Sequence, residues 1–117
     1  MAAIKISMIR GDTRKINVVA LDATGAALDL TGSTVYLTVN ASQTPTDDTT
    51  AVLQKQTTTH TAPTLGLSSI TLVNADTQNI LPDTYFYDIQ VKDVAGNVTS
   101  ATASTFTITG DITRRLT

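Results

Sequence analysis

Cysteine, tryptophan and glutamate are all absent from this chain of 117 residues. Without cysteine there are no disulfides, thiol nucleophiles or thiolate metal sites, so the fold must depend on its hydrophobic core. All ten acidic residues are therefore aspartates, and only eight lysines and arginines oppose them. The net charge of −2 argues against a nucleic-acid partner, which would recognise a basic surface.

Long apolar runs are missing as well. No stretch approaches the roughly 20 residues that a membrane-spanning helix needs, and the first residues lack the pattern of a secretory signal. We therefore expect no membrane partner, and synthesis in the cytoplasm of the host cell. The length fits one domain, which we assign to residues 1–117, with a short tail at 110–117.

Threonine makes up about a fifth of the chain, and valine and isoleucine are frequent, which favours strands over helices. Alternation of apolar and polar residues predicts seven strands. Short strands separated by frequent turns predict an all-β fold, an immunoglobulin-like Greek-key sandwich, with a barrel as the alternative. The strands are expected at residues 3–9, 13–22, 33–40, 51–57, 65–73, 85–92 and 97–109, the last with a bulge.

The segment that begins at Pro82 is the strongest signal for this fold. Tyr85 and Tyr87 follow a turn, and immunoglobulin-like sandwiches place a tyrosine at such a corner, with its ring inward and its hydroxyl bonded to nearby backbone. One helical turn, capped by Asp76, is expected just before this corner, within residues 74–81. The predicted core residues are Val35, Leu37, Ile70, Tyr85, Tyr87, Ile89, Val91 and Phe106.

Other local expectations concern turns and short segments. Asp22 and Asp93 each precede a glycine by three residues, which predicts two hairpins with one turn design. Residues 28–30 are expected to form a short edge strand. Val19 and Leu21 suggest that the second face of the strand at 13–22 is partly covered.

Residues that could carry chemistry are few and scattered. His60, the only histidine, lies in a predicted loop with no second histidine, cysteine or glutamate to complete a metal site or a nucleophile–base pair, so we interpret it as a solvated loop residue. No aspartates have the spacing of a calcium-binding loop, although 47–48 could approach Asp76 or Asp83 through the fold. Residues 10–12 spell Arg-Gly-Asp, which we interpret as a tight turn rather than an adhesion motif. We expect no catalytic residues, no metal and no cofactor.

Two features predict protein–protein contacts. Tyr36 and Phe86 fall on the outward faces of strands that are neighbours in an immunoglobulin-like sandwich, and together they form a candidate interface, unless the loop at 41–50 covers them. Arg114, Arg115 and Leu116 follow the last strand. Arginines can make forked bonds to carboxylates, so this tail is a candidate docking arm, with a frayed terminus as the alternative.

Short motifs follow one another along this chain in a set order. They are Gly11-Asp12-Thr13, Asp29-Leu30-Thr31-Gly32, Asp76-Thr77, Leu81-Pro82, Tyr85-x-Tyr87-Asp88-Ile89-Gln90-Val91, Asp93-x-x-Gly96, Phe106-x-Ile108 and Asp111-Ile112-Thr113-Arg114. This order resembles the N-terminal domain of the baseplate upper proteins of tailed bacteriophages and related small phage structural proteins.

The resemblance implies an immunoglobulin-like module that performs no catalysis and occupies a place in a virion, as a baseplate, tail, neck or capsid-decorating subunit. Its implied partners are copies of itself and other virion structural proteins. The alternative is a surface or carbohydrate-binding module of the adhesin type, in which loops at 44–50 and 57–64 would hold a ligand. An enzyme is the least favoured class.

Overall fold

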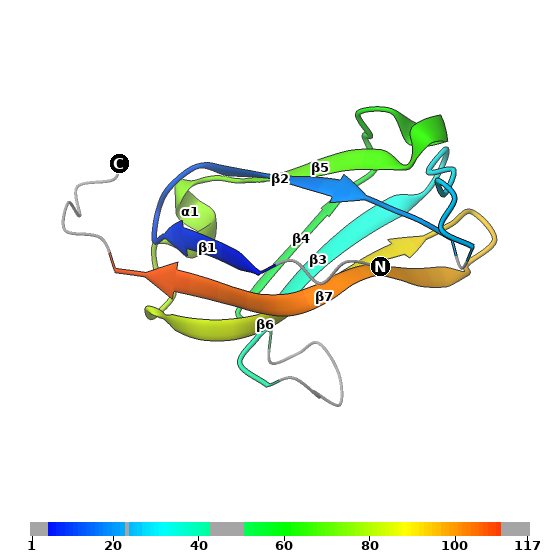
Figure 1. Ribbon diagram of the computed structural model, residues 1–117. Coiled ribbons are helices and arrows are strands. Elements are labelled where there is room, and N and C mark those ends of the chain that lie inside the picture. The colour runs from blue at the N-terminus through cyan, green and yellow to red at the C-terminus, as the bar shows by residue number, and fades with distance from the viewer. Residues whose placement is uncertain (1–4, 23, 43–50, 111–117) are drawn as a thin grey trace.

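The computed structural model describes residues 5–22, 24–42 and 51–110, with only the backbone of Thr102, and they form two packed β-sheets (Figure 1). A short helix, α1 (Asn74–Thr77), lies at one end of the sandwich, and a 3-10 turn, η1 (Pro63–Leu65), lies at the other. The strands are β1 (Ile6–Ile9), β2 (Arg14–Val19), β3 (Thr34–Asn40), β4 (Leu53–Thr57), β5 (Leu67–Leu72), β6 (Asp83–Lys92) and β7 (Val98–Thr109).

The pairing of the strands is that of an immunoglobulin-like sandwich. One sheet has the order β1-β7-β6-β3-β4, and β2 pairs with β5 in the other. All of these pairs are antiparallel except β1 with β7, which is parallel. The second and fifth strands thus face a sheet that contains the third, sixth and seventh, as in immunoglobulin domains, while the fourth strand pairs with the third at the edge of that same sheet. The predicted fold class is confirmed.

The core between the sheets contains every residue that the alternation pattern assigned to it. All eight are at most 6% exposed. The rings of Tyr87 and Phe106, on neighbouring strands, meet edge to face with centroids 6.0 Å apart, a favoured aromatic arrangement. The strand at 97–109 also contains the expected irregularity. Its register against β6 shifts between Ile89 and Gln90, which leaves Ala101 as an extra, buried residue.

The corner before β6 has the predicted tyrosine. Tyr85 is 6% exposed, and its hydroxyl donates to the carbonyl of Leu81 at 2.5 Å. Burial of the ring, followed by the negative charge of Asp83, raises the pKa of this phenol. The neutral hydroxyl therefore remains the donor across the physiological range.

The two turns that share the Asp-x-x-Gly spacing do share one design. Asp22 and Asp93 each accept backbone N–H bonds from the residues two and four positions later. Asp22 also accepts a hydrogen bond from the Thr24 hydroxyl. Together these bonds lower the pKa of both carboxyls; the largest effect comes from the Thr24 hydroxyl at Asp22 and from the backbone amide of Asn97 at Asp93. A third aspartate, Asp29, caps its turn through the hydroxyl and amide of Thr31. The carboxylates therefore hold local turns.

Three local expectations were wrong or incomplete. Residues 28–30 form no strand; Leu30 is instead fully buried, and its amide bonds the Pro63 carbonyl. Val19 is 56% exposed, because nothing in the described part of the chain covers the outer side of the two-stranded sheet there. Asp76 does cap α1, but from inside its first turn, where its carboxylate accepts the Val73 amide.

Candidate functional site

The outward face of the five-stranded sheet, which we call the outer face, carries both aromatic residues of the predicted interface. Side chains alternate along a strand, so the residues between buried ones point away from the core. Tyr36 and Phe86 both do so and are half-buried. Tyr36 pairs with Gln90 and Phe86 with Asn40, so the two rings are separated by four register positions, about 13 Å along the strands. The structure places them on one face but not in contact.

Asp88 lies between the two rings. It is half-buried, pairs with Thr38 on one side and Ala103 on the other, and stands two residues from Phe86 along β6. It is the only acidic residue at an outward position of this sheet within the described chain. Burial raises the pKa of its carboxyl. The outer face is therefore nearly neutral, with one carboxylate at its centre.

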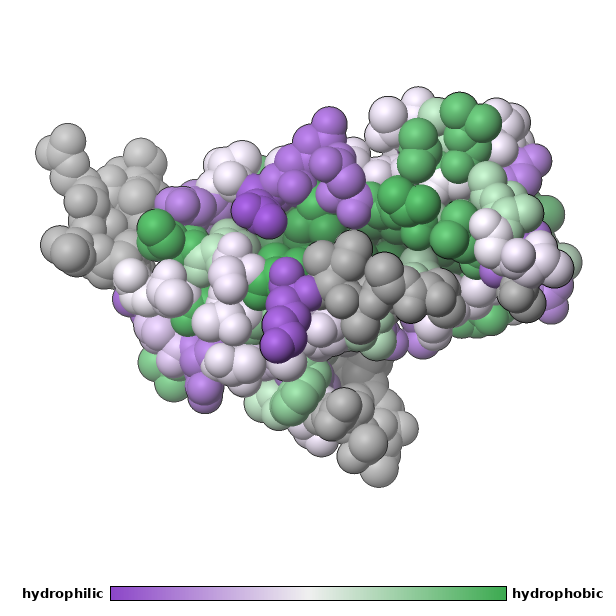
Figure 2. Space-filling model, in the orientation of Figure 1, coloured by the Kyte–Doolittle hydropathy of each residue, from purple (hydrophilic) through white to green (hydrophobic). Residues whose placement is uncertain are grey.

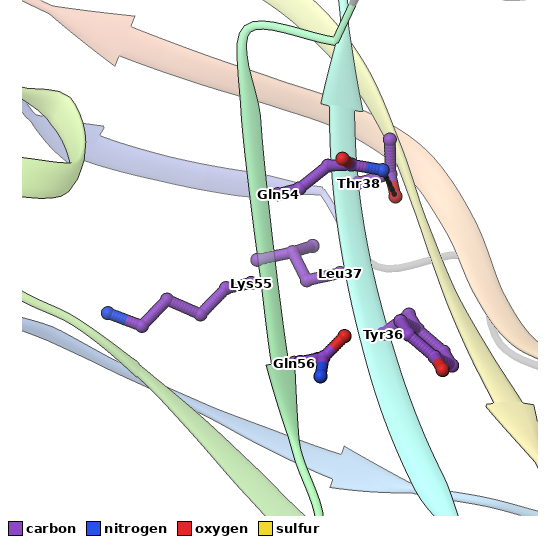
Figure 3. Close-up of a pocket in the computed structure, with 6 residues that line it drawn as sticks. All are labelled: Tyr36, Leu37, Thr38, Gln54, Lys55 and Gln56. Atoms are coloured by element: carbon purple, nitrogen blue, oxygen red, sulfur yellow. Dashed lines mark hydrogen bonds between the residues drawn. The ribbon is translucent and has the colours of Figure 1, made fainter. Parts of the chain in front are cut away.

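A shallow groove runs along the outer face beside Tyr36. It has a volume of about 360 Å³ and lies over β3 and β4. The side chains of Tyr36, Thr38, Gln54 and Gln56 lie on one side of the two strands, whereas Lys55 points away from them (Figure 3). The Gln54 amide donates to the Thr38 hydroxyl at 3.4 Å. The groove presents uncharged hydrogen-bonding groups next to one aromatic ring.

Several predicted residues lie outside the described chain. Arg114, Arg115 and Leu116 are among them, as are the residues 43–50 of the loop that was expected to be able to cover the aromatic pair. Asp47 and Asp48, the candidate cation ligands, fall in the same segment. In the described part of the chain, no group of three histidine or aspartate side chains is arranged to hold a metal ion.

His60 is not the solvated loop residue that the sequence suggested. Its Nε2 donates to the Ser33 carbonyl at 2.8 Å, so in the neutral ring Nδ1 accepts the hydroxyl of Ser68, 2.9 Å away. A hydroxyl bonded to a ring nitrogen is the pairing that activates a serine nucleophile. Ser68 is only 3% exposed, so no substrate can reach its hydroxyl from solvent. The pair ties the loop to β5 and to the turn before β3.

The Arg-Gly-Asp tripeptide forms the turn between β1 and β2, as interpreted from the sequence. Gly11 has a φ of 85° and is buried, and its amide donates to the Thr77 hydroxyl at 2.8 Å. Its carbonyl accepts from the side chain of Asn74 at 3.0 Å. Both of these bonds hold the turn against α1, so the tripeptide does not project as a free loop tip.

Lys55 and Asp76 form an ion pair of 2.6 Å between β4 and α1. Burial alone would raise the pKa of Asp76, but the hydrogen bond from Lys55, the Val73 amide and the charge of Lys55 outweigh it, and the pKa is lowered. An inward-pointing lysine also discourages pairing at this sheet edge. The sequence pattern carries no signal for this contact, because 21 residues separate the two partners.

Exposed apolar side chains gather at the end of the sandwich that carries η1, whereas hydrophilic residues cover β2 (Figure 2). Leu65 in η1 is 61% exposed, and Val94 in the β6–β7 turn is 82% exposed.

Within the described residues, no helix has the length and apolar character needed to span a membrane.

No protein-family model and no curated protein sequence matches this chain. Among solved structures, one described as "Tim-1" aligns with 98% of this chain and 99% of its own length, at 11% sequence identity and a TM-score of 0.45. A likeness at this level carries no information about activity or partners.

Proposed function

We propose that this protein is a non-catalytic structural subunit of a bacteriophage particle, in which it acts through contacts with copies of itself and with other virion proteins. The order of the motifs from Gly11 to Arg114 supports the phage assignment. The proposal covers a baseplate, tail, neck or capsid-decorating position.

The observation that carries a contact function is the outer face. Several polar groups elsewhere in the described chain hold the fold together: three aspartates cap turns, Asp76 pairs with Lys55, and His60 ties a loop. The outer face instead offers two half-buried rings and a carboxylate on a regular sheet. Surfaces that combine aromatic residues with few charged groups are typical of protein interfaces.

Two measurements test this function. The genes beside the one that encodes this chain should encode capsid, portal or tail proteins, and mass spectrometry of purified particles from that genome should detect this protein at a fixed ratio to the other subunits. Its absence from purified particles would contradict the proposal.

Self-association is tested separately by light scattering at tens of micromolar protein. We expect oligomers, and we expect the double variant Tyr36→Ser/Phe86→Ser to weaken association while it remains folded. Because both side chains are only half-buried, their replacement leaves the core intact. Unchanged association would place the contact elsewhere.

A carbohydrate-binding role is the second candidate, and the groove beside Tyr36 favours it. Amide and hydroxyl groups next to an aromatic ring suit a neutral sugar, whose hydroxyls need hydrogen bonds and whose C–H face packs on the ring. This groove lies on the sheet over β3 and β4, whereas the sequence suggested loops at 44–50 and 57–64, the first of which lies outside the described residues. A glycan array probed with the wild type and with Tyr36→Ala tests it; binding that is equal for both proteins would exclude this groove.

A further inference from the structure

The carboxylate of Asp88 is held partly out of water without compensation. No hydrogen bond or ion pair joins it to any residue in the described part of the chain, and burial alone accounts for its raised pKa. A partly desolvated carboxylate without donors costs free energy whenever it is charged. A partner that supplied a cationic donor would remove that cost.

The surroundings of Asp88 specify what kind of donor fits. Tyr36 and Phe86 flank it at two register positions on either side, about 7 Å along the strands. The nearest outward charge on β6 is Lys92, four residues away. A guanidinium makes forked bonds to a carboxylate and also stacks on aromatic rings, whereas an ammonium group does neither as well.

The chain itself contains a matching segment. Two of its four arginines, Arg10 and Arg14, lie at the β1–β2 turn, and Arg10 contacts the Ile80 carbonyl. The other two are adjacent, at 114 and 115, beyond the end of β7. We propose that the segment 111–117 of one copy docks on the outer face of a second copy, where its arginine pair binds Asp88. This inference rests on the self-association in the proposed function.

The dimensions of β7 favour a second copy over docking within one chain. Asp88 lies opposite Ala103, six residues before Thr109, which is about 20 Å from the end of the strand. A four-residue turn that begins at Thr109 would end at Ile112, which leaves Arg115 three positions, about 10 Å, back along the strand direction. Docking within one copy would therefore require a tight turn and a fully extended arginine side chain, whereas the tail of a second copy can approach the outer face without either constraint.

Each copy then contributes one tail and receives one tail on its outer face. Such a contact is heterologous, and it closes into a ring or continues as a filament. Two complementary variants separate the halves of this contact. Asp88→Asn impairs the outer face and keeps the tail, while Arg114→Gln/Arg115→Gln impairs the tail and keeps the face.

The experiment is sedimentation velocity of the full chain at tens of micromolar protein. We expect each variant alone to show a Kd at least about tenfold higher than the wild type. An equimolar mixture should form a complex of one copy of each variant and nothing larger, because only one intact contact remains between them. Asp12→Asn removes one negative charge and Arg14→Gln one positive charge, both at exposed positions away from the outer face, and each control should assemble as the wild type does.

Thermal unfolding distinguishes an interface role from a structural one. Asp88→Asn should be at least as stable as the wild type at neutral pH, since the amide avoids the cost of the partly buried charge. If the wild type assembles and Asp88→Asn assembles equally well, this inference is wrong, but the proposed self-association stands. A wild type that stays monomeric overturns both, while its detection in purified particles would still support the virion function.

Discussion

The hydroxyl of Tyr85 offers a direct measure of what the corner before β6 contributes to stability. Tyr85→Phe keeps the buried ring and removes only the bond to the Leu81 carbonyl. The net value of such a bond is about 1 kcal/mol, so we expect the free energy of unfolding to fall by about that amount. In a domain of this size, that loss corresponds to a decrease in Tm of about 4 °C.

The assay is urea and thermal unfolding at a protein concentration low enough to prevent association. Tyr36→Phe is the matched control, because Tyr36 is half-buried and its hydroxyl has no hydrogen bond to the described residues. The control should lose less than about 0.5 kcal/mol. Equal losses in the two variants, or no loss in Tyr85→Phe, would refute the assigned role of this bond.

The pH dependence gives a second check on Tyr85. Its folded pKa lies above the usual 10.0, so the stability linked to the neutral hydroxyl is fully present below pH 10.0. It is lost as the pH rises through the folded value. The difference in free energy of unfolding between the wild type and Tyr85→Phe should therefore be constant around neutral pH and should become smaller only in strongly alkaline solution.

Two further predictions concern glycine conformation and the ion pair. Gly25 and Gly66 both have positive φ, but a Cβ at Gly66 would lie 2.5 Å from the Ala20 carbonyl oxygen, whereas one at Gly25 meets nothing within 4 Å. In urea unfolding, Gly25→Ala should lower the free energy of unfolding by about 1 kcal/mol, and Gly66→Ala should lower it clearly more. Equal losses would contradict the expected clash at Gly66. Lys55→Met should cost about 0.5 kcal/mol at neutral pH, because its partner Asp76 is also partly exposed. Because the pKa of Asp76 is lowered, the contribution of the ion pair is present above pH 3.8 and is lost in acid, where the free energies of unfolding of the wild type and Lys55→Met should become equal. A difference in unfolding free energy that stays constant down to pH 2 would contradict this role.

Strands, turns and the tyrosine corner could be predicted because their causes are local. Alternation along β6 assigns its buried face wherever the strand lies, since a period of two depends only on the pleat. Asp22 and Asp93 bond amides within four residues, and Tyr85 bonds the carbonyl four residues before it. These contacts need no knowledge of the rest of the chain.

The candidate site depended on contacts between distant residues. Tyr36 and Phe86 were correctly assigned to outward positions, but their separation and the position of Asp88 between them follow from the register of β3 against β6. The pairing of His60 with Ser33 and Ser68, and of Lys55 with Asp76, likewise joins separate segments.

The sequence by itself therefore determined which residues face the core and where the chain turns, because both depend on neighbours within a few positions. The tertiary structure alone decided that β1 runs parallel to the last strand, that Leu30 is buried without a strand, and that a lone carboxylate stands between two rings. The physical reason is that register and packing are set by contacts between segments far apart in the chain, and no local pattern contains that information.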